Sequence, residues 1–91
     1  MESMRIIDGF TMRSVAGENI VSGESIAQIN FNKLISLNES AAYLWSEVVG
    51  GDFTTEMLAE LLITKYKIDS ELALVDAKMV AQSWIEAGLI E

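Results

Sequence analysis

The chain has 91 residues, of which 51% are hydrophobic, and a formal net charge of −8. This length fits one domain over residues 1–91, and the apolar content argues against disorder. It has no cysteine and no histidine, and it carries 6 basic against 14 acidic residues. These counts exclude disulfides, thiolate metal sites and a histidine base, and they make nucleic acid or an anionic membrane an unfavourable partner.

The first ten residues include Glu2 and Asp8 and no long apolar run, so they do not resemble a secretion signal. No segment approaches the roughly 20 apolar residues that span a bilayer. The chain also lacks a glycine-rich phosphate loop and a pattern of metal ligands. We therefore expect a cytoplasmic protein that holds no cofactor and no metal.

The N-terminal third predicts a small antiparallel sheet. Residues 10–16 and 18–22 are short apolar segments on either side of Gly17, a pattern typical of a hairpin. Residues 26–31 alternate in part and predict a further strand. Residues 33–37 predict the last strand, which leads directly into the first helix.

Three helices are predicted in the rest of the chain. Asn38, Thr54 and Asp69 each precede an apolar periodic segment, and each side chain can cap a helix N-terminus. An acidic residue follows in the first turn, where it favours the helix dipole. Gly50 ends the first helix and Gly88 ends the third.

Each helix has apolar residues at three- and four-residue spacing, which predicts one buried face per helix. The expected buried residues are Ala41, Leu44, Trp45 and Val48 in the first helix, Met57, Leu58, Leu61 and Leu62 in the second, and Leu72, Val75, Met79, Val80 and Trp84 in the third. Leu89 and Ile90 are expected to pack back onto the core.

The predicted architecture is α+β, with a small antiparallel sheet over about residues 10–37 followed by helices over about 38–88. This is also the inventory of a winged helix-turn-helix, so a DNA-binding regulator is an alternative. A recognition helix needs basic or amide side chains toward the DNA groove. The last helix offers Lys78 and Gln82 for this role against several acidic residues, and that balance repels phosphate. An enzyme is the least favoured class, because histidine and cysteine are missing and no convergent pair of acids can be argued.

The strand over residues 33–37 could lie at the edge of the sheet. An exposed edge can bind an extended peptide by strand addition. It can also pair with a second copy of the chain, so a structural dimerisation domain and a homodimer stay open. The edge could instead be covered by the N-terminus.

Residues 37–45, which read LNESAAYLW, resemble the signature of the PqqD-like family, which includes coenzyme PQQ synthesis protein D and related recognition elements for ribosomally made precursor peptides. Residues 51–56 (GDFTTE) and 66–69 (YKID) resemble the family's entries to the second and third helices. The C-terminal matches are Asp76, Val80, Ala81, Trp84 and Gly88-Leu89-Ile90. The resemblance covers about residues 10–90. Ala77 and Ala81 are smaller than the aliphatic residues that the family leads us to expect.

The resemblance implies a winged-helix-like, non-catalytic module that binds the leader part of a precursor peptide as an added strand. A radical SAM enzyme is the usual partner of this family. Carried over to this chain, the peptide-binding residues are Lys33, Leu34, Ile35, Ser36 and Leu37 on the strand and Asp76, Met79 and Ser83 on the facing helix. Core packing is the alternative for Met79. On this view Leu34→Asp or Ile35→Pro weakens peptide binding more than folding.

Overall fold

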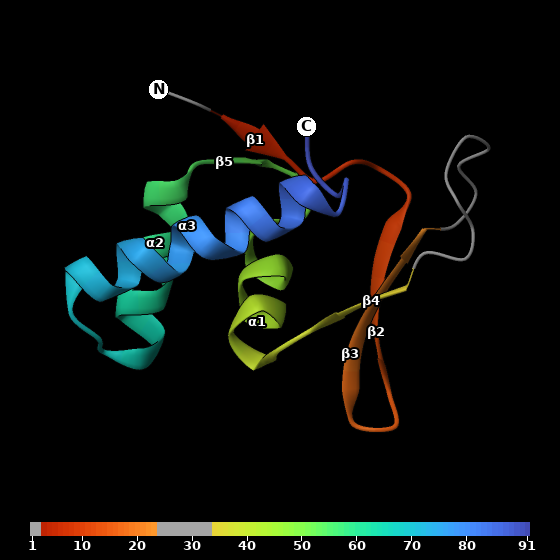
Figure 1. Cartoon of the computed structure of the whole chain (residues 1–91), viewed down its shortest axis with the longest axis horizontal. Helices are drawn as coiled ribbons and strands as arrows, with labels where there is room; N and C mark the ends of the chain where they lie inside the picture. Colours follow the sequence, from red (N-terminus) through yellow and green to blue (C-terminus); the bar gives the residue numbers. More distant parts are fainter. Residues whose placement is uncertain (1–2, 24–33) are drawn as a thin grey trace.

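The computed structural model of the chain describes residues 3–23 and 34–91 (Figure 1). Its elements are β1 (Met4–Arg5), β2 (Phe10–Val15), β3 (Glu18–Gly23), β4 (Leu34–Leu37), α1 (Glu39–Val48), β5 (Asp52–Phe53), α2 (Thr55–Tyr66) and α3 (Ser70–Glu86). The predicted small antiparallel sheet followed by three helices is confirmed. The strand predicted at residues 26–31 lies outside the described residues, and so does Lys33.

The strands form a three-stranded antiparallel sheet in the order β2-β3-β4 and a separate two-stranded sheet of β1 and β5. The predicted hairpin is the β2–β3 pair, which closes with Val15 opposite Glu18. Its two loop residues, Ala16 and Gly17, have φ of 52° and 83°. Positive φ at both positions is the type I′ geometry, whose twist matches that of the flanking strands.

One face of the larger sheet packs against the helices. Met12, Val21 and Ile35 lie side by side across β2, β3 and β4 on that face. Val21 and Leu37 are buried, and Met12 and Ile35 are packed against the same core. The opposite face carries polar residues such as Ser36, as the period of two along each strand requires.

All three predicted N-caps are confirmed. Each cap side chain accepts a hydrogen bond from a backbone N–H of its helix's first turn: Asn38 from Ala41 at 2.9 Å, Thr54 from Met57 at 3.2 Å and Asp69 from Glu71 at 3.1 Å. Gly88 follows the end of α3 with φ of 77°, in agreement with its predicted role as a helix stop. The cap bonds set where each helix begins, and Gly88 marks the end of α3.

Aromatic side chains fill the centre of the core. The Trp84 ring meets the Trp45 ring at 5.4 Å and the Phe53 ring at 6.0 Å between centroids, both edge to face. Such pairs stabilise a core beyond their buried area. They tie α3 to α1 and to β5, which belongs to the two-stranded sheet.

The predicted buried face of α3 is confirmed for Trp84, and Val80 packs against the core, but the prediction is wrong for Leu72, Val75 and Met79. The helix buries Ala73, Ala77, Ala81 and Trp84, whereas Leu72, Val75 and Met79 are 50%, 54% and 65% exposed. Small side chains let α3 approach its neighbours closely, so the alanine row rather than the larger apolar row faces the core. Met57 on α2 was likewise expected inside and is 45% exposed.

The described N-terminal segment, which includes β1, lies beside the C-terminus, on the side where β1 and β5 pair (Figure 1). Backbone bonds join Arg5 and Glu91 in both directions at 3.0 and 2.9 Å, and Ile7 donates to Leu89 at 2.9 Å. Leu89 is fully buried, which confirms that the C-terminus packs onto the core. The described part of the N-terminus therefore pairs with β5 and the C-terminus, and it does not cover β4.

Candidate functional site

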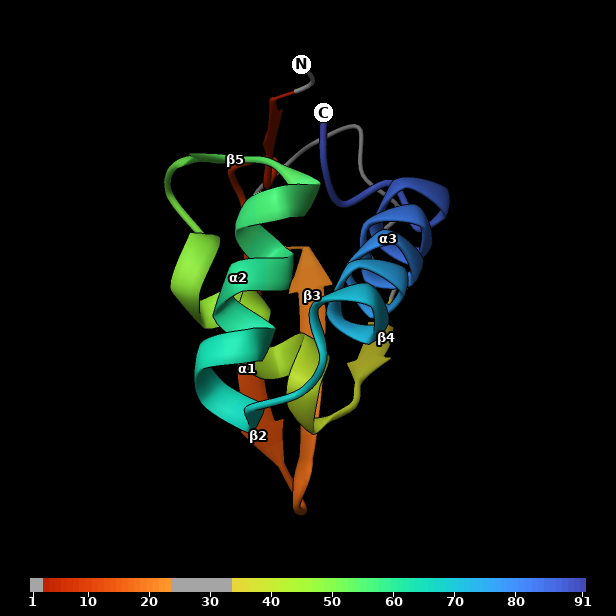
Figure 2. The ribbon, with the colours of Figure 1, turned by 90° about the vertical axis from the view of Figure 1, so that its left-hand side faces the viewer.

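Strand β4 is at the edge of the larger sheet. Among the described residues its single sheet neighbour is β3. The other side of β4 lies beside α3 (Figure 2). A peptide in extended form could therefore lie against β4 and under α3, provided that backbone groups of β4 point outward.

The direction of those groups follows from the hairpin turn. Val15 and Glu18 are opposite each other across the two-residue loop, so they exchange backbone hydrogen bonds. Backbone groups alternate in direction along a strand. Glu18 therefore points its N–H and C=O toward β2, and Asn19 and Val21 point theirs toward β4.

The register of β4 then shows which of its backbone groups point away from β3. Ile35 pairs with Val21, and Leu37 pairs with Asn19, so Ile35 and Leu37 direct their backbone groups toward β3. Leu34 and Ser36 direct theirs away from the sheet. The expected effect of Ile35→Pro is therefore wrong, because that change removes a bond of the sheet itself, whereas Ser36→Pro removes an outward amide.

A narrow cleft of about 220 Å³ separates the end of β4 from α3. We call it the β4–α3 cleft; it is lined by Ser36, Leu37, Asn38, Ala41, Met79, Val80, Ser83 and Trp84. Met79 is 65% exposed, the largest exposure among the exposed large apolar side chains. The cleft thus offers an apolar contact on α3 opposite an outward strand edge.

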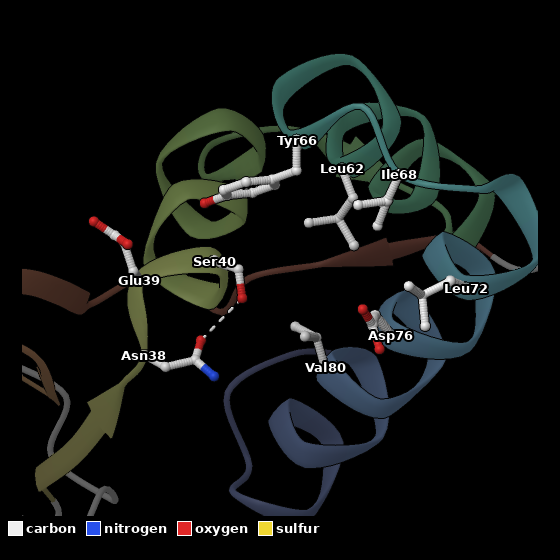
Figure 3. A pocket seen from close by; sticks show the side chains of 9 residues that line it. All are labelled: Asn38, Glu39, Ser40, Leu62, Tyr66, Ile68, Leu72, Asp76 and Val80. Atoms are coloured by element: carbon white, nitrogen blue, oxygen red, sulfur yellow. Dashed lines mark hydrogen bonds between the residues drawn. The ribbon is translucent and has the colours of Figure 1, made fainter.

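A second, larger hollow of about 430 Å³ lies along the same helix, α3 (Figure 3). This interhelix hollow is lined by Asn38, Glu39, Ser40, Leu62, Tyr66, Ile68, Leu72, Asp76 and Val80. Asn38 and Val80 line both spaces. The two spaces therefore adjoin along α3, between the strand edge and the junction of the three helices, and we refer to them together as the path.

The interhelix hollow combines an apolar surface with acidic groups. Leu62, Ile68 and Val80 point into it from α2, the α2–α3 connection and α3 (Figure 3). Its charged lining residues are Glu39 and Asp76, and no lysine or arginine of the described residues lines it. The hollow can therefore accept an apolar side chain that has a positive charge near it.

The predicted site residues lie in different places in the structure. Ser36, Leu37, Met79 and Ser83 meet in the β4–α3 cleft, whereas Asp76 lies in the interhelix hollow. Ile35 contacts the core side of the sheet and lines neither space. Leu34 contributes backbone groups that point away from β3, as its pairing with Ser22 requires.

Sequence reasoning missed Asn38 and Val80 as lining residues, and it missed the apolar residues of α2 in the hollow. Val80 could have been found, because it lies one turn from Asp76 and next to Met79 on the same helix. The residues that α2 contributes to the hollow, including Tyr66, depend on how α2 and α3 pack. Sequence spacing alone carries no signal for that contact.

Within the described residues, no helix is long and apolar enough to cross a membrane. The same part of the chain contains no group of three or more His, Cys, Asp or Glu residues that could hold a metal ion.

Comparison with known proteins places the chain in a family. No curated protein matches it. A solved structure described as "Lasso peptide synthetase B1 complexed with the leader peptide" has the same fold, with a TM-score of 0.73 at 16% identity over 97% of this chain and 96% of that one. The family of coenzyme PQQ synthesis protein D (PqqD) matches residues 19–90, which include β4 and all three helices. The chain therefore belongs to the PqqD family.

Proposed function

We propose that this chain binds the leader part of a ribosomally made precursor peptide as a strand added to β4. The observation that carries the proposal is the outward backbone of Leu34 and Ser36 beside a cleft with an exposed Met79. Membership of the PqqD family supports it, and so does the likeness in fold to a protein solved with its leader peptide.

Backbone bonds to Leu34 and Ser36 would supply affinity that is independent of the peptide's side chains. Alternate peptide side chains would point toward α3, where Met79, Val80 and Ser83 lie. Burying a whole methionine side chain contributes about 1.5–3 kcal/mol. Because Met79 is 65% exposed, covering it would contribute on the order of 1–2 kcal/mol.

The length of the path sets how much peptide it can hold. From Leu72 to Ser83 the helix rises about 16 Å, at about 1.5 Å per residue. An extended peptide covers that distance with about five residues. The chain's net charge of −8, with Glu39 and Asp76 at the hollow, favours a leader segment that is basic or neutral.

We propose that the chain performs no chemistry itself and presents the bound leader to a separate modifying enzyme. A radical SAM enzyme is the partner that the family resemblance suggests. The absence of cysteine and histidine from the sequence is consistent with a binding role. We place the protein in the cytoplasm, where ribosomally made precursors are synthesised.

The test is a titration of the ¹⁵N-labelled protein with the leader of a short peptide encoded beside it. We expect amide shifts in Leu34–Leu37 and along α3. Hydrogen exchange should slow at Leu34 and Ser36 and stay unchanged at Ile35 and Leu37, whose amides already bond to β3. Slowing at all four amides, or shifts confined to other elements, would contradict strand addition at this edge.

Self-association is the competing use of the same edge, since two copies of β4 could pair with each other. Sedimentation at increasing protein concentration, with and without the leader, separates the two. A dimer that persists at saturating leader would favour the dimerisation hypothesis. A monomer that binds one leader would favour peptide recognition.

A further inference from the structure

A third groove lies between α1 and α2, away from β4 and α3. It has a volume of about 420 Å³ and is lined by Glu47, Val48, Glu56, Met57, Glu60, Leu61 and Thr64. None of these residues lines the β4–α3 cleft or the interhelix hollow. A molecule bound in this α1–α2 groove would therefore leave the proposed leader site free.

The floor of the α1–α2 groove is apolar. Val48 is buried, Leu61 is half-buried, and Met57 is 45% exposed although methionine is an apolar residue. Met57 and Leu61 are four residues apart on α2, so they lie on one face of that helix. The floor is thus a short apolar strip set between two helices.

The rim of the groove is acidic. Glu47 comes from α1, and Glu56 and Glu60 come from α2, and all three are exposed. None of their side chains makes an ion pair or a hydrogen bond with a residue that the structure describes. Glu56 and Glu60 are four residues apart on α2, a spacing at which like charges repel. Positive charges from a partner would relieve this repulsion.

The one basic residue of α2, Lys65, does not neutralise the carboxylates of the rim. Lys65 in the last turn of α2 lies over the Tyr43 ring, with its ammonium 5.1 Å from the ring centroid. It does not line the groove. The charge of the rim is therefore left for a partner molecule.

We propose that the α1–α2 groove docks an amphipathic helix of a partner protein, with apolar residues on its floor and lysine or arginine along its flanks. Helices bind such grooves through side chains at three- and four-residue spacing. An extended peptide would gain less here, because the walls are helices whose backbone groups are already bonded internally. This site goes beyond the proposed function and does not depend on leader binding.

Charge distinguishes a basic partner helix from the other molecules that could occupy the groove. A second copy of the chain would bring another −8 of net charge against an acidic rim. Phosphate groups of nucleic acid or of a lipid surface would be repelled in the same way. A basic amphipathic helix meets both the apolar floor and the carboxylates.

The probe is a synthetic helical peptide with leucines at positions i, i+3, i+4 and i+7 and lysines on both flanks, titrated into the ¹⁵N-labelled protein. The matched control peptide has glutamates in place of the lysines. We expect the basic peptide to shift the amides of Val48, Met57 and Leu61, and the acidic peptide to leave them unchanged. Binding should weaken as ionic strength rises from about 0.1 to 1 M, which shortens the Debye length from about 10 to 3 Å.

Replacing the three rim carboxylates tests their role. The variant combining Glu47→Gln, Glu56→Gln and Glu60→Gln is expected to bind the basic peptide roughly tenfold more weakly, as expected for exposed ion pairs. The control variant changes net charge equally through Glu71→Gln, Glu86→Gln and Glu91→Gln and should bind as the parent does. Leader titrations of the two variants should agree with each other, because both remove three carboxylates that lie outside the leader site.

Three outcomes would overturn the proposal. They are no shift in the groove at millimolar basic peptide, equal loss of affinity in the rim and control variants, and shifts confined to β4 and α3. The last result would place the basic peptide in the leader site. Failure of leader binding alone would contradict the proposed function and leave the groove proposal standing, because the two sites share no residue.

Discussion

Ser36→Pro is the sharpest test of strand addition. The Ser36 amide points away from β3, because the neighbouring residues Ile35 and Leu37 are the ones whose backbone groups bond to β3. Proline lacks the N–H and is tolerated on edge strands whose amide faces outward. The change therefore removes one donor from the leader site and no bond from the sheet.

The size of the effect follows from one lost hydrogen bond. Removing the donor leaves a peptide carbonyl unpaired in the bound state, which costs about 1–3 kcal/mol. At 1.4 kcal/mol per factor of ten, leader affinity should fall by roughly 5- to 150-fold. The folded protein also loses the 3.2 Å bond from Ser36 Oγ to Glu18. Since that bond is exposed, its loss should cost well under about 1 kcal/mol.

Two further variants control the measurement, which is calorimetric titration of the leader together with thermal unfolding. Ser36→Ala removes the same hydroxyl but keeps the amide, so it should bind the leader as the parent does. Ile35→Pro removes a bond to Val21, which is fully buried, and should lower the free energy of unfolding by at least about 1–3 kcal/mol. Equal leader affinity for Ser36→Pro and Ser36→Ala would refute the assignment of the free edge.

Other substitutions test the site and the fold. Met79→Asp should weaken leader binding at least tenfold with little change in stability, because Met79 is 65% exposed in the cleft. Ile85→Asp is the control and should leave the leader titration unchanged, because Ile85 is 51% exposed on the same helix but lies outside the cleft. Asn38→Ala should lower the melting temperature by about 4–8 °C, through loss of about 1 kcal/mol of capping. Asn38→Asp should not lower it, because aspartate also caps a helix. An equal fall in melting temperature for the two variants would argue against capping. Gly17→Ala places a side chain at φ of 83° and should lower the free energy of unfolding by about 1–2 kcal/mol. Gly51→Ala is the control. Gly51 has no positive φ and has open space at Cβ, so this change should leave the free energy of unfolding in chemical denaturation unchanged.

Elements with local signals could be predicted from the sequence. The helix starts depend on a cap residue and an amide two or three positions later, so Asn38, Thr54 and Asp69 carry the information themselves. The hairpin depends on a two-residue loop that contains Gly17. Each of these structures involves residues close together in the chain.

Elements that need distant partners could not be predicted. Strands β1 and β5 have two residues each, too few to form a pattern of their own, and they pair across about half of the chain. The direction of the free amides on β4 is another case. It depends on the register that joins Val21 to Ile35, and a shift by one residue would exchange the free and bonded groups.

The exposed face of α3 shows why the site itself was harder to predict than the fold. Larger apolar residues normally mark the buried face of a helix. In α3 the alanine row from Ala73 to Ala81 is buried instead, and Leu72 and Met79 remain exposed. Exposed apolar residues in a row are uncommon on a soluble monomer unless the surface binds something. A helix with small residues on one face and larger apolar residues on the opposite face is therefore a signal of binding. The sequence itself carries this signal, because small side chains allow close packing on the face that they occupy.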